Sequence, residues 1–215
     1  MNNIPLSYSA ARLYCDCKKL FYHTYILKDQ PKPSSPAMER GKLVHMKLRE
    51  SVINKTYPKG IFVPTGYLEW IWEHKGKAEV SLALSNSLDW MEFFDNSCYV
   101  RGKIDVVVLN DKIHIIDWKT GFPKWDEIQR NFTHLLVTKG MDKDIMFHWV
   151  WVDSGETEVQ KSTKEDSEKA IELIEKIRNE TDFSPWASWR CNFCGVNDCN
   201  FNRKSGNKKS PQFQF

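Results

Sequence analysis

Two acidic residues and a lysine stand close together in this sequence, in a pattern that can support hydrolytic chemistry. Asp105 ends the segment Gly102-Lys103-Ile104-Asp105, and Asp117 opens Asp117-Trp118-Lys119-Thr120-Gly121 twelve residues later. Two carboxylates can hold Mg²⁺ or Mn²⁺ through oxygen ligands, and a nearby ammonium can orient a water nucleophile or stabilise charge on a phosphoryl oxygen. Asp105, Asp117 and Lys119 are therefore candidates for metal-assisted phosphoryl chemistry.

The residues between the two acids predict a β-hairpin that brings these side chains together. Two β-branched runs, Val106–Leu109 and Ile113–Ile116, are joined by a turn at Asn110-Asp111. Because side chains alternate along a strand, Asp117 and Lys119 project from one face and Trp118 from the other. The alternative is that both acids lie at strand ends as surface ions, paired with Lys103 and Lys119.

A histidine on a predicted helix is a fourth candidate. The helix spans residues 37–54, and His45 shares its inner face with Gly41 and Leu48, since residues three and four apart lie on one side of a helix. An inward histidine is either a core residue or a metal ligand, and imidazole suits Mn²⁺ somewhat better than Mg²⁺.

These residues, in this order, resemble the motifs of the PD-(D/E)XK nuclease superfamily. Asp105 stands in the place of the first acid and Asp117-Trp118-Lys119 in the place of the (D/E)XK element, while Arg40–His45 resembles the Gly-x-x-x-His motif of the RecB-like branch. The resemblance implies an α/β, restriction-endonuclease-like core with a mixed central β-sheet flanked by helices. The ligands it implies for Mg²⁺ or Mn²⁺ are His45, Asp105, Asp117 and the backbone carbonyl of Trp118. The catalytic residues it implies are Asp105, Asp117 and Lys119.

Two further residues have counterparts in this branch. Glu79 precedes an apolar strand and has an analogue in many members, although a solvated acid at a strand edge explains it equally well. A glutamine that opens a Gln-x-x-x-Tyr helix usually follows the catalytic lysine, and here Gln129 is followed by Thr133 in place of the tyrosine. We expect both side chains to support the metal ligands rather than to bind metal.

Thiols are concentrated near the end of the sequence. Three of them lie within nine residues, as Cys191, Cys194 and Cys199. This C-x₂-C-x₄-C spacing in a reducing compartment indicates Zn²⁺ or an iron–sulfur cluster, and both need a fourth ligand. On a predicted helix over residues 7–27, Cys17 shares the inward stripe, whereas Cys15 is rotated by roughly 200° toward the other side. Cys17 is therefore the better fourth ligand, and unliganded buried thiols are the alternative.

The cysteine arrangement also resembles the iron–sulfur staple of the CRISPR spacer-acquisition nucleases and of the AddB subunit of the AddAB helicase–nuclease. In those proteins one cysteine of the N-terminal helix and three beyond the last helix hold a structural 4Fe-4S cluster. The resemblance assigns such a cluster here, with Zn²⁺ as the alternative, to Cys17, Cys191, Cys194 and Cys199. Lys18 stands where proline is usual, and the last spacing is four residues where five is common.

Charge indicates at most a local basic patch. The formal net charge is +3, and the three lysines of residues 204–215 account for all of it, so residues 1–203 are formally neutral. DNA binding must then come from a few residues near the metal face. The candidates for phosphate contacts, each otherwise a solvated surface charge, are Arg12, Lys18, Lys19, Arg40 and Lys42. The tryptophans that could stack on single-stranded bases, or else only pack, are Trp70, Trp72 and Trp125.

Length and composition indicate one soluble domain. The chain of 215 residues is 41% hydrophobic and 27% charged, with no run of about eighteen apolar residues. We expect a nuclease domain with the cysteine cluster over residues 1–203, a disordered basic tail over 204–215, and no membrane segment or secretion signal. A cytoplasmic location, in a bacterial, archaeal or phage-infected host cell, would keep the cysteines reduced.

The remaining elements follow from periodicity. Helices are predicted over residues 7–27, 37–54, 66–75, 125–138 and 165–181. Strands besides the hairpin are predicted over residues 79–84, 90–94, 98–109, 145–153 and 158–163. The order of helix, three strands, helix and strand is the αβββαβ core expected of the resembled superfamily.

We expect a metal-dependent deoxyribonuclease that hydrolyses DNA phosphodiesters and, by resemblance to the branch, an exonuclease acting on DNA ends. CRISPR adaptation, phage recombination and DNA repair are all open as its pathway. The sequence contains no P-loop, so helicase coupling would need a partner, and a helicase, a recombinase or CRISPR adaptation proteins are candidates. The alternative is a non-catalytic DNA-binding or scaffold module of the same fold, against which the intact acids and lysine argue.

Overall fold

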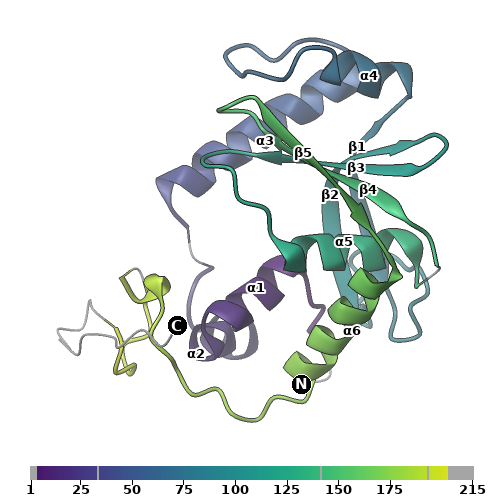
Figure 1. The fold of residues 1–215 in the computed structure, drawn as a ribbon. Helices are drawn as coiled ribbons and strands as arrows, with labels where there is room; N and C mark the ends of the chain where they lie inside the picture. Colours follow the sequence, from purple (N-terminus) through teal and green to yellow (C-terminus); the bar gives the residue numbers. More distant parts are fainter. Residues whose placement is uncertain (1–3, 33, 141, 193, 203–215) are drawn as a thin grey trace.

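A five-stranded mixed sheet in the order β1-β2-β3-β4-β5 forms the centre of the molecule (Figure 1). The structure is a computed structural model that describes residues 4–32, 34–140, 142–192 and 194–202. The strands are β1 (Lys77–Leu84), β2 (Val100–Leu109), β3 (Ile113–Lys119), β4 (Ile145–Trp151) and β5 (Glu156–Ser162). Neighbours are antiparallel except β3 and β4, which are parallel. The predicted α/β fold with a mixed central sheet is confirmed.

Helices cover both faces of this sheet, so its central strands are apolar on both sides. In Figure 1, α3 (Pro36–Asn54) and α4 (Tyr67–Glu73) lie on one side and pack against alternate residues of β2, β3 and β4. The helices on the other side are α1 (Tyr8–Asp16), α5 (Glu127–Thr138) and α6 (Lys164–Arg178). The shorter elements are α2 (Lys18–Phe21), a π-helical turn (Tyr22–Leu27) and a 3₁₀ turn (Trp189–Asn192).

The crossover helix α5 connects the two parallel strands, which a tight turn cannot do. Asp126 caps its N-terminus by accepting hydrogen bonds from the N–H groups of Ile128 (3.0 Å) and Gln129 (3.4 Å). The first turn of α5 thus follows shortly after Lys119 and stays near the carboxyl end of β3.

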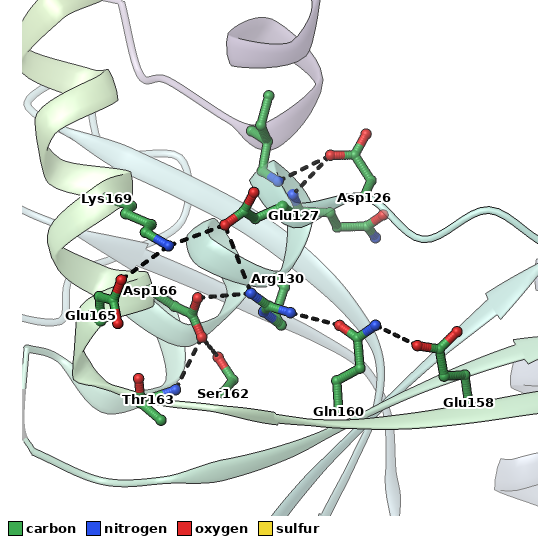
Figure 2. A network of polar contacts seen from close by, with 12 residues as sticks. Asp126, Glu127, Arg130, Glu158, Gln160, Ser162, Thr163, Glu165, Asp166 and Lys169 are labelled. Carbon is green, nitrogen blue, oxygen red and sulfur yellow. Dashed lines mark hydrogen bonds and ion pairs between the residues drawn. The ribbon is translucent and has the colours of Figure 1, made fainter.

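A polar network fixes α5 to α6 and β5 (Figure 2). Arg130 of α5 forms an ion pair with Asp166 of α6 (3.1 Å) and donates a hydrogen bond to Gln160 of β5 (2.6 Å). Asp166 is buried, and it also accepts hydrogen bonds from the Ser162 hydroxyl (2.6 Å) and the Thr163 N–H (3.0 Å). Because a buried charge is costly unless it is paired, the network favours one position of the crossover helix.

The predicted helix over residues 7–27 is wrong in one respect, because it breaks at Cys17. This residue has an extended backbone with φ −167° and ψ 111°, and its N–H donates to the Leu13 carbonyl (2.8 Å), which ends α1. A second helix then begins at Lys18. The rotation inferred for a continuous helix does not apply here, although Cys17 is buried and Cys15 is only partly so.

The predicted strand over residues 90–94 is also wrong. Trp90 makes one isolated bridge to Leu84, and the flanking residues form turns, with Ser85 N–H bonded to the Asp89 carbonyl (2.9 Å). This segment lies along the free edge of β1, where the Met91 N–H also donates to the Ala83 carbonyl (3.1 Å), but the pairing does not continue into a strand. The other predicted elements are present, with ends shifted by up to three residues.

The predicted disordered tail, residues 204–215, lies outside the described residues. Within the described part of the chain, no helix is both long and apolar enough to cross a membrane. That finding agrees with the apolar segments read from the sequence.

Candidate active site

The two acids meet where β2 and β3 separate. The last pair between the two strands is Val106 with Ile116. Asp105 immediately precedes Val106 in β2, just beyond the paired part. Beyond the last pair, the Trp118 N–H donates instead to Asp105 Oδ2 (3.0 Å). This hydrogen bond holds the first acid beside the strand that carries the second.

Asp117, Lys119 and Gln129 form a closed set of contacts. Lys119 Nζ lies 2.8 Å from Asp117 Oδ2 and donates to Gln129 Oε1 (2.6 Å), while Gln129 Nε2 donates to Asp117 Oδ1. Trp118 is buried on the opposite face, against α3 and α4. The predicted alternation is therefore correct, and α5 brings Gln129 to the acids although the tyrosine of its motif is missing.

His45 reaches the site from α3. Its Nδ1 lies 3.1 Å from Asp105 Oδ1, and its side chain is 36% exposed. Burial alone would lower the pKa of His45, but the hydrogen bond and negative charge of Asp105 raise it above its ordinary value. His45 is thus not a core histidine surrounded by apolar residues, and it directly contacts the first acid.

The buried position of Asp117 makes its charge costly. Burial raises the pKa of this carboxyl, Lys119 opposes the rise, and the neighbouring Asp105 adds to it. Within the described residues, Asp117 Oδ2 accepts no hydrogen bond, although the Lys119 ammonium is its ion-pair partner. A cation bound next to the two acids would offset the cost of burying the Asp117 charge and would reduce the repulsion between the two carboxylates.

A profile described as the PD-(D/E)XK nuclease superfamily matches residues 62–199, which include Asp105, Asp117, Lys119 and Gln129. The chain belongs to this superfamily. The predicted superfamily is confirmed, whereas the RecB-like branch and the likeness to iron–sulfur nucleases stay predictions. As a PD-(D/E)XK protein, the chain belongs to a superfamily of metal-dependent nucleases.

One solved structure that resembles this PD-(D/E)XK chain is titled "Crystal structure of SSO0001". The two share 16% sequence identity with a TM-score of 0.50, over 88% of this chain and 82% of that chain. At that identity the likeness shows the fold alone. A comparison with curated proteins finds no match.

The donors of the PD-(D/E)XK site fit the divalent ions that this superfamily uses. Two carboxylates and an imidazole suit Mg²⁺ or Mn²⁺, and burial of Asp117 next to Asp105 favours a nearby cation. As the side chains stand, the described residues include no group of three His, Cys, Asp or Glu side chains arranged to hold a metal ion. His45 contacts Asp105, and Lys119 contacts Asp117, in separate pairs instead.

Glu79, the other predicted supporting residue, lies in β1 between the pairs that flank Asp105 of β2. Its backbone has φ 49°, a left-handed value that is strained in a strand, and its side chain forms an ion pair with Arg49 (3.0 Å). The structure thus brings its backbone close to the site and its carboxylate to a surface arginine. Both interpretations of Glu79 stay open.

The five predicted phosphate-binding residues are all ion-paired. The pairs are Arg12 with Asp16 and Asp126, Lys18 with Glu180, Lys19 with Asp198, Arg40 with Asp153, and Lys42 with Glu39. Of these five, Arg12 lines a cavity together with Lys119. Lys18 and Lys19 connect α2 to segments that follow α6, which gives them a structural role, and their contact with DNA stays a prediction.

The four cysteines assigned to a cluster are all buried, and Cys17, Cys194 and Cys199 belong to one core cluster. Among the described residues, these side chains do not form a group arranged to hold a metal ion. The pKa of Cys17 is raised by burial and further by Cys194 and Cys199, and the pKa of Cys194 by burial and by Cys199 and Cys191. The described cysteines are free thiols rather than disulfides. The assignment of these thiols to a metal therefore stays a prediction.

Sequence analysis missed one residue that shapes this site. Asp153 follows β4, accepts the Gly121 N–H (2.6 Å) just beyond Lys119, and binds Arg40 of α3. The hydrogen bond from Arg40 and the Gly121 N–H lower its pKa to about 2. A signal was available, because parallel strands such as β3 and β4 end at the same edge of a sheet.

Proposed function

We propose that this chain is a metal-dependent deoxyribonuclease that acts as an exonuclease on DNA ends. The observation that carries the proposal is the meeting of Asp105 and the buried Asp117 beside the Lys119 ammonium. The residues that would hold Mg²⁺ or Mn²⁺ are His45, Asp105, Asp117 and the backbone carbonyl of Trp118. When bound, the ion supplies Lewis acidity at the scissile phosphate.

Lys119 orients the reacting groups in this proposal. An ammonium has three N–H donors, and two of them face Asp117 and Gln129. The third is available for the attacking water or for a phosphoryl oxygen. A donor held in place before the reaction stabilises the charge that develops on the phosphate without having to reorganise.

A nuclease assay tests the proposal. Linear single- and double-stranded DNA is incubated with Mg²⁺ or Mn²⁺ and either wild type, Lys119→Ala or Lys112→Ala. Lys112 is an exposed lysine at the opposite end of β3, so its variant is a matched control. We expect Lys119→Ala to lose roughly 100-fold or more of the rate and Lys112→Ala to lose almost none. Equal rates in the two variants would overturn the assignment of Lys119 as catalytic. No cleavage by the wild type with either metal would support the non-catalytic scaffold instead.

The exonuclease part of the proposal has its own test. A circular DNA of the same sequence has no ends, so an exonuclease should leave it intact while it digests the linear form. Cleavage of both forms at one rate would overturn the preference for ends. CRISPR adaptation, phage recombination and DNA repair all generate DNA ends, and a helicase, a recombinase or CRISPR adaptation proteins would be the partners.

We further propose that Cys17, Cys191, Cys194 and Cys199 hold a structural 4Fe-4S cluster, with Zn²⁺ as the alternative. Their burial, with three of the four thiols in one core cluster, and the resemblance to the iron–sulfur staple support this proposal. A brown protein with broad visible absorption would favour the cluster, because Zn²⁺ has no d–d or redox spectrum. A colourless protein loaded with zinc would exclude it.

A further inference from the structure

The loop between β3 and α5 is anchored at both ends. Near its start, the Gly121 N–H binds Asp153, and at its end Asp126 caps α5 and also accepts the Tyr8 hydroxyl (3.1 Å). The loop begins directly after Lys119. Side chains on residues 120–126 therefore have a defined position relative to the proposed catalytic lysine.

Trp125 of this loop faces a cavity rather than the core. The cavity measures about 460 Å³ and is also lined by Lys119, Lys124, Arg12 and Tyr8. That volume lies within the range of roughly 300–1,000 Å³ typical of ligand sites. A substrate group that enters the cavity would meet the tryptophan ring and the lysine ammonium together.

The ring of Trp125 differs from the other exposed indoles. Trp125 is 46% exposed, and among the described residues no aromatic ring or cation stacks on it. Trp90 and Trp186 each have a lysine ammonium over the ring, 5.0 Å and 6.0 Å from its centre. A large apolar face is thus left available next to the proposed site.

Three basic side chains line the cavity, Arg12, Lys119 and Lys124, beside two acidic ones, Asp126 and Glu127. Lys124 forms no ion pair with any described residue, and Arg12 is shared between Asp16 (3.5 Å) and Asp126 (3.3 Å). An unpaired lysine beside an aromatic face is the combination that binds single strands, with the cation on a phosphate and the ring on a base.

We propose that Trp125 is a stacking platform for an unpaired base next to the scissile phosphate, and that it makes single-stranded DNA the preferred substrate. This inference rests on the proposed nuclease function. A base inside a duplex already stacks on both neighbours and cannot offer its face, whereas an unpaired base can. Every base has such a face, so the preference is for single strands rather than for a sequence.

Binding measurements test the platform. Fluorescence anisotropy of a labelled single-stranded oligonucleotide is measured with wild type, Trp125→Ala, Trp125→Phe and Phe122→Ala. Phe122 is 96% exposed on the same loop but does not line the cavity, so its variant is the matched control. We expect Trp125→Ala to weaken binding roughly 5- to 100-fold, Trp125→Phe to retain most of the affinity, and Phe122→Ala to change it little.

Abasic oligonucleotides show whether the lost contact is with a base. One base at a time is removed along the strand. At one position the removal should weaken wild-type binding by the same factor as Trp125→Ala, and it should not weaken Trp125→Ala further. Equal losses in Trp125→Ala and Phe122→Ala, or additive effects at every abasic position, would overturn the platform.

The two proposals fail in different ways. A protein that cleaves DNA but binds it equally well with and without Trp125 overturns the platform alone. A protein whose binding depends on Trp125 but which never cleaves DNA upholds the platform and overturns the catalytic assignment. A wild-type protein that neither binds nor cleaves single strands overturns both.

Discussion

At the scale of single residues, the site depends on how the Lys119 ammonium is held. Its acceptors come from two elements, Asp117 on the same strand and Gln129 on α5. Gln129 also donates to Asp117, so one amide connects both proposed catalytic side chains. We therefore assign Gln129 as a positioning residue, since it acts through Lys119 and Asp117.

Replacing Gln129 with alanine should slow catalysis with little effect on substrate binding. Without the amide, Lys119 can rotate toward Asp117 alone, and misplacement of a catalytic group by about 1 Å can cost as much as 100-fold in rate. We expect kcat to fall roughly 10- to 100-fold with KM nearly unchanged. Steady-state kinetics measure kcat and KM separately, and a thermal melt shows whether the variant is still folded. An unchanged kcat would contradict the positioning role.

At the scale of elements, α5 gains its position from contacts on the side away from the acids. Its first turn carries Gln129, and the next residue, Arg130, enters the network of Figure 2 with α6 and β5. Since adjacent helical residues point in different directions, one turn of α5 both contacts the site and anchors to the scaffold. The strength of this anchor decides how firmly the site is held.

Replacing Asp166 with asparagine should destabilise the fold in a pH-dependent way. Burial would raise the pKa of Asp166, but hydrogen bonds from Ser162, Thr163 and Arg130 hold it below its ordinary 3.8. A carboxyl with a lowered pKa in the folded state stabilises the fold at pH values above its ordinary pKa. That stabilisation is lost as the pH falls through the pKa of the folded state. We expect a loss of about 2 kcal/mol at neutral pH that shrinks below pH 3.8. Urea unfolding at several pH values measures it.

The control for this experiment is the neighbouring Glu165→Gln. The Glu165 side chain is 71% exposed and pairs only at the surface with Lys169 (3.1 Å). Such pairs contribute little, so we expect a change below about 0.5 kcal/mol at every pH. Equal losses in the two variants would show that the buried network does not anchor α5.

At the scale of the whole molecule, the cysteines connect the two ends of the described chain. Cys17 lies at the break between α1 and α2, and the other three thiols follow α6. Two ion pairs span the same ends, Arg190 with Asp16 (2.6 Å) and Lys19 with Asp198 (2.9 Å). A metal at this position would close a loop of most of the chain, so its loss should weaken the entire fold.

Replacing Cys17 with serine should remove the metal and lower the melting temperature. The matched controls are Cys15→Ser, a partly exposed thiol nearby, and Cys98→Ser, a buried thiol that is not assigned to the cluster. We expect metal content, measured by elemental analysis, to fall in Cys17→Ser and to stay unchanged in both controls. Metal retained in Cys17→Ser would exclude it as a ligand. Metal absent from the wild type prepared without oxygen would refute the cluster itself.

The sequence predicted the parts of the site that depend on neighbouring residues. Alternation along one strand put Asp117 and Lys119 on one face, and a helical period put His45 inward, as the structure has them. It could not predict that Arg40 binds Asp153, because the two lie 113 residues apart and no local pattern connects them. The ion pairs of Lys18 with Glu180 and of Lys19 with Asp198 were missed for the same reason.

The sequence by itself determined the superfamily, the hairpin and the nature of the catalytic candidates, because motif spacing and periodicity are properties of consecutive residues. Only the tertiary structure decided that the first helix breaks at Cys17 and that residues 90–94 make one isolated bridge to β1 rather than a strand. It also decided that Trp125 faces the cavity with Lys119. Packing between distant segments sets which side chains stay exposed, and periodicity does not contain that information.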